Sequence, residues 1–190
     1  MSSNSAIDLT LDERATLRAL ARASIQTGLV GERLTVQPEA YTPALRAPGA
    51  TFVTLHIDSE LRGCIGTLEA RDPLVLDVVA NAYGAAYRDP RFPALTRVEF
   101  ERLDLHISIL SPPEPLAVES EEDLLTQLRP GIDGLILSEG RRRGTFLPAV
   151  WDALPEPRLF VQHLKQKAGL PTDYWSATLT VARYTTESIS

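Results

Sequence analysis

The most reactive side chain in this sequence is its one cysteine, Cys64, in the stretch LRGCIG. A cysteine thiolate attacks carbonyls, disulfides and activated carbons, and a nearby guanidinium lowers the pKa of the thiol. Arg62 lies two residues away, and residues two apart share one face of a regular strand. Gly63 and Gly66 could let a ligand approach the backbone and accept hydrogen bonds from its N–H groups. We therefore take Arg62, Gly63 and Gly66 as candidate ligand-binding residues and Cys64 as a candidate nucleophile.

A structural interpretation of the same stretch competes with the catalytic one. Free cysteine is among the most buried residue types, and a glycine in a strand often marks a bulge or close packing. No base that would activate Cys64 is evident in the sequence, so the structural interpretation is favoured over nucleophilic catalysis. Whether the protein is an enzyme therefore stays open.

A second group of candidate residues could recognise an anion. The stretch DPRFP holds Asp89 and Arg91 on either side of Pro90, and its two prolines fix the path of the chain. Arg91 could bind an anionic ligand through its fork-shaped guanidinium, together with Arg62 and Arg143. Arg143, like Arg62, directly precedes a glycine. The structural alternative is a turn in which Asp89 accepts from backbone amides and Arg91 pairs with a carboxylate.

The sequence indicates no metal site and does not identify a cofactor. His56, His106 and His163 are the only histidines, and their spacing matches no HxH, HxxxH or HExxH pattern. We expect them to be structural. Neither a phosphate-binding GxxxxGK[ST] loop nor a GxGxxG turn after a strand is present.

The elements that must position these residues follow from periodicity and from turn residues. Hydrophobic alternation, helical spacing, caps and prolines predict a series of helices and strands. We expect helices over Leu11–Thr27, from Pro73 to about Asp89, after Ser120, and over Pro157–Ala168, a loop over Leu34–Gly49, and strands at Thr51–Ile57, LRGCIG, Leu103–Ile109, Ile132–Ser138, Arg141–Phe146 and TLTVARY.

The order of hairpin, helix and single strand occurs twice along this chain, which suggests a duplication. Hairpins with helices between them favour an α+β fold over a doubly wound parallel sheet. We expect a mainly antiparallel sheet, open or barrel-like, that is built from these two repeats and flanked by helices. The whole of residues 1–190 is expected to form a single domain, whose two lobes could enclose a cleft.

Composition narrows the class of protein. The formal net charge of −6 disfavours a nucleic-acid binder, because binding to phosphates needs a basic face. One cysteine fits a reducing compartment, and the first ten residues lack the basic and apolar regions of an export signal, so we expect a cytoplasmic protein without membrane partners. The oligomeric state is open.

The motifs LRGCIG, DPRFPALT, LDLHISILSPPEPL and GIDGL, followed by an arginine-glycine turn into FLPAVW, occur here in one order from Thr51 to Tyr184. In that order they resemble the AMMECR family, called AmmeMemoRadiSam system protein A in prokaryotes. The resemblance implies an α+β fold, a cleft lined by LRGCIG, and a pathway shared with a Memo-like protein and a radical SAM enzyme. It implies no established reaction. Two hypotheses follow: a site for a small, anionic ligand, or a non-catalytic module that docks those partners.

Overall fold

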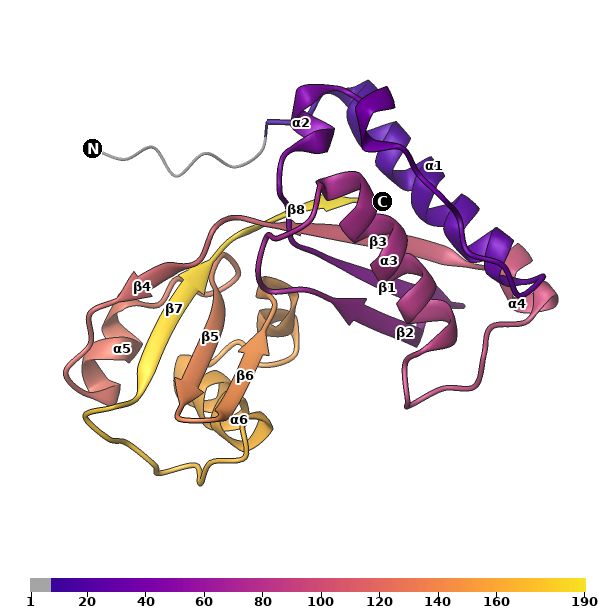
Figure 1. Ribbon diagram of the computed structural model, residues 1–190. Helices are drawn as coiled ribbons and strands as arrows, with labels where there is room; N and C mark the ends of the chain where they lie inside the picture. Colours follow the sequence, from indigo (N-terminus) through magenta and orange to yellow (C-terminus); the bar gives the residue numbers. More distant parts are fainter. Residues whose placement is uncertain (1–7) are drawn as a thin grey trace. The chain divides into compact units, whose positions relative to one another are not determined.

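The computed structural model describes residues 8–190 of the chain (Figure 1). These residues form two compact units. The first unit comprises the described residues up to Ser111 together with Glu187–Ser190, and the second unit is Pro112–Thr186. Residues 1–7 lie outside the described residues. They make up most of the N-terminal segment in which no export signal was expected.

The first unit contains a four-stranded sheet and two long helices. Thr10 and Glu13 form the capping box that the sequence predicts at the start of the first helix. The elements of this unit are α1 (Leu11–Gly28), η1 (Pro38–Ala40), α2 (Pro43–Arg46), β1 (Thr51–Ile57), β2 (Glu60–Gly66), α3 (Leu74–Tyr87), α4 (Arg97–Glu101), β3 (Asp104–Leu110) and β8 (Thr186–Ile189).

The second unit repeats the same kind of architecture. Its helices begin where the sequence predicts, after Ser120 and at Pro157. The elements are β4 (Glu114–Leu116), α5 (Glu121–Gln127), β5 (Gly134–Glu139), β6 (Arg142–Phe146), η2 (Pro148–Asp152), α6 (Pro157–Lys167) and β7 (Thr180–Tyr184).

The two sheets have equivalent strand orders, which is what a duplication of hairpin, helix and strand would produce. The first sheet has the order β2-β1-β3-β8, and the second, read from its hairpin edge, has the order β6-β5-β7-β4. In each, the first hairpin strand pairs antiparallel with the returning strand and with the single strand that follows the helix. The α+β, mainly antiparallel fold is therefore confirmed, and the described residues form two open sheets rather than a closed barrel.

One face of the first sheet carries its hydrophobic core. Alternate residues of β1, such as Val53 and Leu55, are fully buried, whereas Thr54 and His56 between them are partly exposed. Helix α3 packs against β1 and β2, and α1 packs against α3 and β3. Thr54, Cys64 and His106 are paired neighbours across the strands, so they share the other face.

A buried polar network fixes α3 to β1. The carboxylate of Asp77 accepts hydrogen bonds of 2.6 Å from the hydroxyls of Thr51 and Thr67, and the Asn81 amide donates to the same carboxylate and to Thr51. Desolvation raises the pKa of Asp77. Because these partners join the start of β1 to α3, the network sets the position of the helix that lies against β2.

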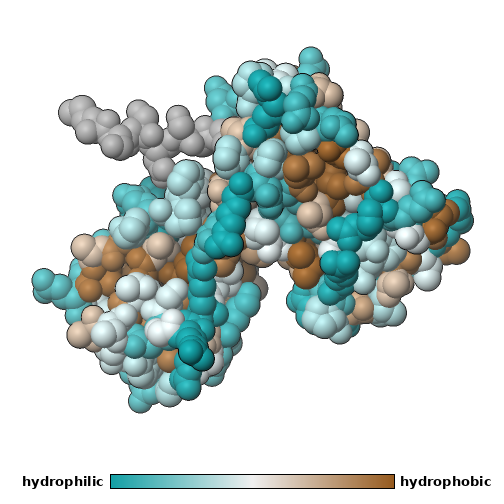
Figure 2. Space-filling model, in the orientation of Figure 1, coloured by the Kyte–Doolittle hydropathy of each residue, from teal (hydrophilic) through white to brown (hydrophobic). Residues whose placement is uncertain are grey.

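On the face drawn in Figure 2, hydrophilic residues surround hydrophobic patches on both units. No helix among residues 8–190 combines the length and the apolar character that crossing a bilayer requires.

Candidate functional site

Cys64 lies near the end of β2, partly exposed, and both its backbone and its side chain are held in place. Its N–H donates to Asp89 Oδ2 at 2.9 Å, and its sulfur lies 3.2 Å from the Thr54 hydroxyl oxygen. Thr54 is the residue of β1 directly opposite Cys64, and His106 of β3 is opposite Thr54 on the other side. The three side chains therefore form a row across the sheet, with the threonine between the thiol and the imidazole.

Arg62 does not continue this row, because it lies at a β-bulge in β2. Leu55 pairs with Gly63, but the next residue of β1, His56, pairs with Leu61, so Arg62 is the extra residue of the bulge. The regular alternation that would place Arg62 and Cys64 on the same face ends at this point. A bulge was one of the alternatives that the glycines of LRGCIG suggested.

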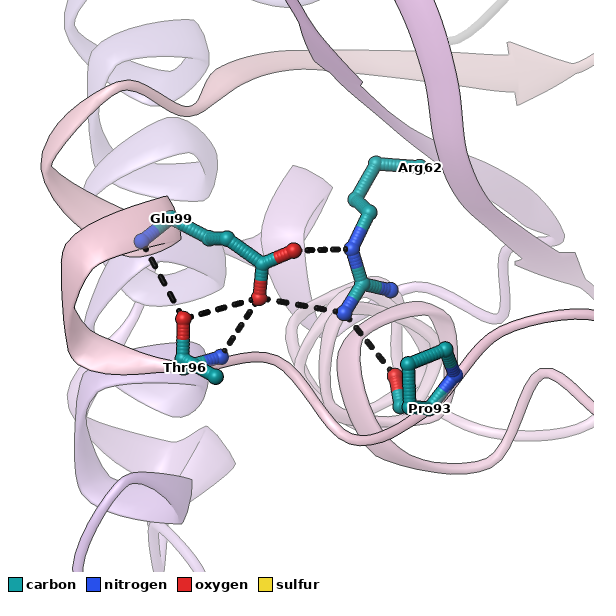
Figure 3. Close-up of polar contacts among 4 residues, drawn as sticks. All are labelled: Arg62, Pro93, Thr96 and Glu99. Carbon is teal, nitrogen blue, oxygen red and sulfur yellow. Dashed lines mark hydrogen bonds and ion pairs between the residues drawn. The ribbon is translucent and has the colours of Figure 1, made fainter.

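The guanidinium of Arg62 is buried and paired within the first unit (Figure 3). Its Nε donates to Glu99 Oε1 at 2.8 Å, and its Nη2 donates to Glu99 Oε2 at 3.2 Å and to the Pro93 carbonyl at 2.9 Å. These hydrogen bonds lower the pKa of Glu99 to about 2. Arg62 thus fixes the segment that follows DPRFP to the bulge of β2.

Glu99 itself belongs to a capping box at the start of α4. Its carboxylate accepts from the N–H and the hydroxyl of Thr96, while its own N–H donates to the Thr96 hydroxyl (Figure 3). The pattern of a threonine followed three residues later by a glutamate is a recognisable signal for a helix start. Sequence reasoning overlooked it and so missed both α4 and the partner of Arg62.

Asp89 and Arg91 form a tight pair directly beside Cys64. Arg91 donates to both carboxylate oxygens of Asp89, from Nε at 3.0 Å and from Nη2 at 2.7 Å, and its N–H donates at 3.1 Å. These bonds, led by those from the guanidinium, hold the pKa of Asp89 well below its ordinary range. The Asp89 side chain is 2% exposed, whereas that of Arg91 is 55% exposed, so the pair joins a buried anchor to an accessible cation.

The two glycines of LRGCIG lie where no side chain fits without movement of a neighbour. A Cβ atom on Gly63 would lie 2.1 Å from the Ala85 carbonyl oxygen of α3, and one on Gly66 would lie 2.3 Å from the ring of Phe52. Close packing of the strand against the helix and of the backbone against the ring accounts for both glycines. A ligand contact at either glycine stays a prediction.

Arg143 belongs to the second unit, where it pairs with Ser138 across the hairpin. Its neighbour Gly144 is the counterpart of Gly63, because each glycine lies opposite a fully buried leucine and against a helix. A Cβ atom on Gly144 would lie 3.0 Å from the Ala168 side chain, at the end of α6. The resemblance between the two arginine-glycine pairs therefore has a packing cause, and a role of Arg143 in the Cys64 site stays a prediction.

His56 and His106 are neighbours in the first unit, whereas His163 is exposed on α6 of the second unit. The rings of His56 and His106 are 5.4 Å apart in an edge-to-face arrangement, and His106 Nε2 lies 2.9 Å from Asp104 Oδ2. Within residues 8–190, no group of three histidine, cysteine, aspartate or glutamate side chains could hold a metal ion.

The order of the motifs agrees with comparisons of the whole chain. A family model described as AMMECR1 matches residues 18–189. The chain belongs to the AMMECR1 family. Relatives include Protein MJ0810 of Methanocaldococcus jannaschii, 39% identical over 176 residues that cover 89% of this chain and 85% of the relative. A protein of Methanothermobacter thermautotrophicus is 40% identical over 170 residues, which cover 87% of this chain and 86% of the relative.

A solved structure also resembles this AMMECR1-family chain. The crystal structure of uncharacterized protein PH0010 from Pyrococcus horikoshii matches with a TM-score of 0.85 and 33% sequence identity, over 91% of this chain and 88% of that one. The family relationship and the α+β fold are thus shown.

The arrangement around Cys64 is better suited to binding than to nucleophilic catalysis. The hydrogen-bond partner of the thiol is the Thr54 hydroxyl, which is not a base at neutral pH. The imidazole of His106 lies beyond Thr54, one strand further away. We call Arg91, Asp89, Cys64 and Thr54 the Cys64 site, in which a thiol lies near a guanidinium that Asp89 orients.

Proposed function

We propose that this AMMECR1-family protein binds a small, anionic ligand at the Cys64 site. The observation that carries the proposal is the geometry of Arg91, whose guanidinium is oriented by the buried Asp89 yet remains half exposed. Its hydrogen bonds use Nε and Nη2, and among the described residues Nη1 has no protein partner, so two N–H donors remain for a carboxylate or phosphate oxygen.

The surroundings of Arg91 support a defined orientation for that ligand. Arg91 Nη2 also lies 3.5 Å from the Cys64 carbonyl oxygen, and its guanidinium carbon lies 5.5 Å from the centre of the Phe92 ring. Because Asp89 offsets the charge of Arg91, affinity would come from directed hydrogen bonds more than from net charge. The Cys64 thiol would be a contact group for the ligand.

The single cysteine provides a direct test. Inorganic phosphate and malonate serve as probes, and alkylation of Cys64 by iodoacetamide is followed by mass spectrometry. We expect either anion at millimolar concentration to slow alkylation in the wild type and in Arg97→Gln, a matched control on the exposed face of α4. In Arg91→Gln the anions should leave the alkylation rate unchanged. Equal protection in Arg91→Gln and wild type, or no protection in either, would refute the proposal.

A second candidate function is a docking module for a Memo-like protein and a radical SAM enzyme, as the family resemblance suggests. The observation that favours it is the DPRFP loop. Pro90, Arg91 and Pro93 of this loop are exposed, although hydrogen bonds of Asp89 and of Arg62 fix the loop at both ends. A rigid, exposed loop with arginine and an aromatic ring is typical of protein interfaces.

Copurification with both proteins, using wild type, Arg91→Glu and Arg97→Glu, tests this docking function. Loss of the complex in Arg91→Glu alone, with unchanged circular dichroism, would support docking through the loop. No complex with the wild type would refute it.

A further inference from the structure

The first unit contains a hollow that the Cys64 site does not use. It lies between α1 and the start of β3, and its volume is about 430 Å³. This volume falls within the range of about 300–1,000 Å³ that is common for small-molecule sites. The residues that line it are Ala15, Arg18, Ala19, Arg22, Leu103 and Leu105.

The hollow exists because α1 presents small side chains where it passes β3. Ala15 and Ala19 are one helical turn apart and exposed, and they leave uncovered the space that larger side chains would fill. The floor consists of Leu103 and Leu105, which are 8% and 3% exposed. Asp104, between the two leucines, binds His106 on the opposite face of the strand, so it adds no carboxylate to the floor.

The rim of the hollow carries two arginines of α1. Arg18 and Arg22 are four residues apart on α1, so their side chains are neighbours, and both are exposed. Within residues 8–190 neither forms an ion pair, although Arg14 on the same helix pairs with Glu187. Arg22 has its guanidinium carbon 4.5 Å from the centre of the Phe100 ring, which fixes its position at the rim.

This absence of ion pairs is informative in a chain with a formal charge of −6, in which acidic residues outnumber basic ones. Two neighbouring guanidiniums repel each other, and an anion between them removes that repulsion. The apolar floor beside them would favour a ligand with a hydrophobic part.

We propose that this hollow is a second binding site and that its ligand is a small amphipathic anion. The anionic head accepts hydrogen bonds from Arg18 and Arg22, and the apolar part lies against Ala15, Ala19 and the leucine floor. A fatty carboxylate and an alkyl phosphate share this chemistry, and the experiment distinguishes them.

The test uses the full chain and four probes: decanoate, decyl phosphate, decanol and inorganic phosphate. Binding is measured by ¹H–¹⁵N chemical-shift titration, below the critical micelle concentration of each probe. Tryptophan fluorescence is unsuitable, because both tryptophans lie in the second unit and would not report on the hollow. We expect decanoate or decyl phosphate to shift amides of α1 and of Leu103–Leu105. The tighter of the two anions identifies the head group, and decanol and phosphate should each bind at least tenfold more weakly.

Three variants examine the two parts of the site separately. Arg18→Gln and Arg22→Gln should each weaken binding of the anion about three- to fivefold, the range for exposed charge pairs, and leave decanol binding unchanged. Ala19→Phe should block all probes by filling the hollow. Arg46→Gln, an exposed helical arginine that does not line the hollow, should bind like the wild type.

Either of two patterns would overturn the proposal. One is the absence of shifts around α1 and Leu103–Leu105 with any amphipathic probe. The other is equal affinity for decanoate, decyl phosphate and decanol that does not change in Arg18→Gln or Arg22→Gln, because the arginines would then contribute nothing. The Cys64 test is independent, since it reads alkylation of a different site.

Discussion

Replacing Glu99 by glutamine should destabilise the protein at neutral pH and much less in acid. The perturbation removes the negative charge that Arg62 binds but keeps a side chain of the same size. Arg62 is 8% exposed, so its guanidinium would remain buried opposite a neutral amide.

The magnitude follows from the pKa of Glu99. A pKa that falls from the ordinary 4.5 in the unfolded chain to about 2 in the folded protein corresponds to about 3 kcal/mol of stability at pH 7. The carboxylate is 31% exposed, and solvent screening reduces this figure to about 2 kcal/mol. Because the folded pKa is the lower one, the contribution is complete above the unfolded pKa and is lost as pH falls toward the folded pKa.

The assay is urea denaturation followed by circular dichroism at pH 7, 4 and 3. We expect Glu99→Gln to lower the free energy of unfolding by about 2 kcal/mol at pH 7, and by less than half of that at pH 3, where the wild type has lost most of its advantage. Glu101→Gln, which makes the same charge change at the exposed end of α4, should change stability by less than about 0.5 kcal/mol.

A double-mutant cycle with Arg62→Met assigns the effect to the pair. The coupling free energy between the two substitutions should be about 1–2 kcal/mol at pH 7. The reasoning is refuted if the difference between wild type and Glu99→Gln is the same at pH 7 and pH 3, or if Glu99→Gln and Glu101→Gln are equally stable.

Three further predictions concern packing and buried charge. Gly63→Ala should lower the free energy of unfolding by about 2–3 kcal/mol, because the new methyl group would overlap the backbone of α3. Gly144→Ala should lower it by only about 1 kcal/mol, because the contacts of its methyl group begin at 3.0 Å. Urea denaturation measures both values, and a larger loss in Gly144→Ala than in Gly63→Ala would contradict this prediction. Asp89→Asn should lower stability by about 2 kcal/mol and speed alkylation of the neighbouring thiol, and an unchanged alkylation rate would show that Asp89 does not hold the site rigid. Lys165→Met should destabilise the second unit by about 1–3 kcal/mol, since the buried ammonium binds Glu121 at 2.6 Å; tryptophan fluorescence during denaturation measures this, and wild-type stability would exclude it.

Hydrophobic periodicity and caps were sufficient to predict most of the elements. The first helix was expected over Leu11–Thr27 and runs over Leu11–Gly28, and the strand at Thr51–Ile57 is confirmed at both ends. These segments carry their signal locally, in a capping box and in a run of β-branched and aromatic residues. The repeat of hairpin, helix and strand was visible for the same reason.

The elements that the sequence did not reveal are short and stabilised by distant partners. No strand was expected in the stretch SPPEPL, but Glu114–Leu116 forms β4 at the edge of the second sheet, where a proline such as Pro115 is tolerated. Within the expected loop Leu34–Gly49, the structure contains a 3₁₀ turn and the short helix α2. Such pieces have too few residues for periodicity to show.

Only part of the cluster around Cys64 could be named from the sequence, and its orientation could not. Cys64, Asp89 and Arg91 were named from their residue types, and the structure brings them together through hydrogen bonds. The direction of Arg62 depends on a bulge, which the glycines of LRGCIG suggested, but its place in the strand is decided by the register with β1. Thr54, the partner of the thiol, could be found only from that register.

The position of β8 has a consequence for synthesis on the ribosome. This strand lies beside β3 and belongs mainly to the first unit, although it follows the whole second unit in the chain. The second unit is one uninterrupted segment, so it can complete its sheet while the first sheet still lacks a strand and leaves an edge of β3 without its neighbour. The unit that is translated first therefore completes its sheet only with the last residues of the chain.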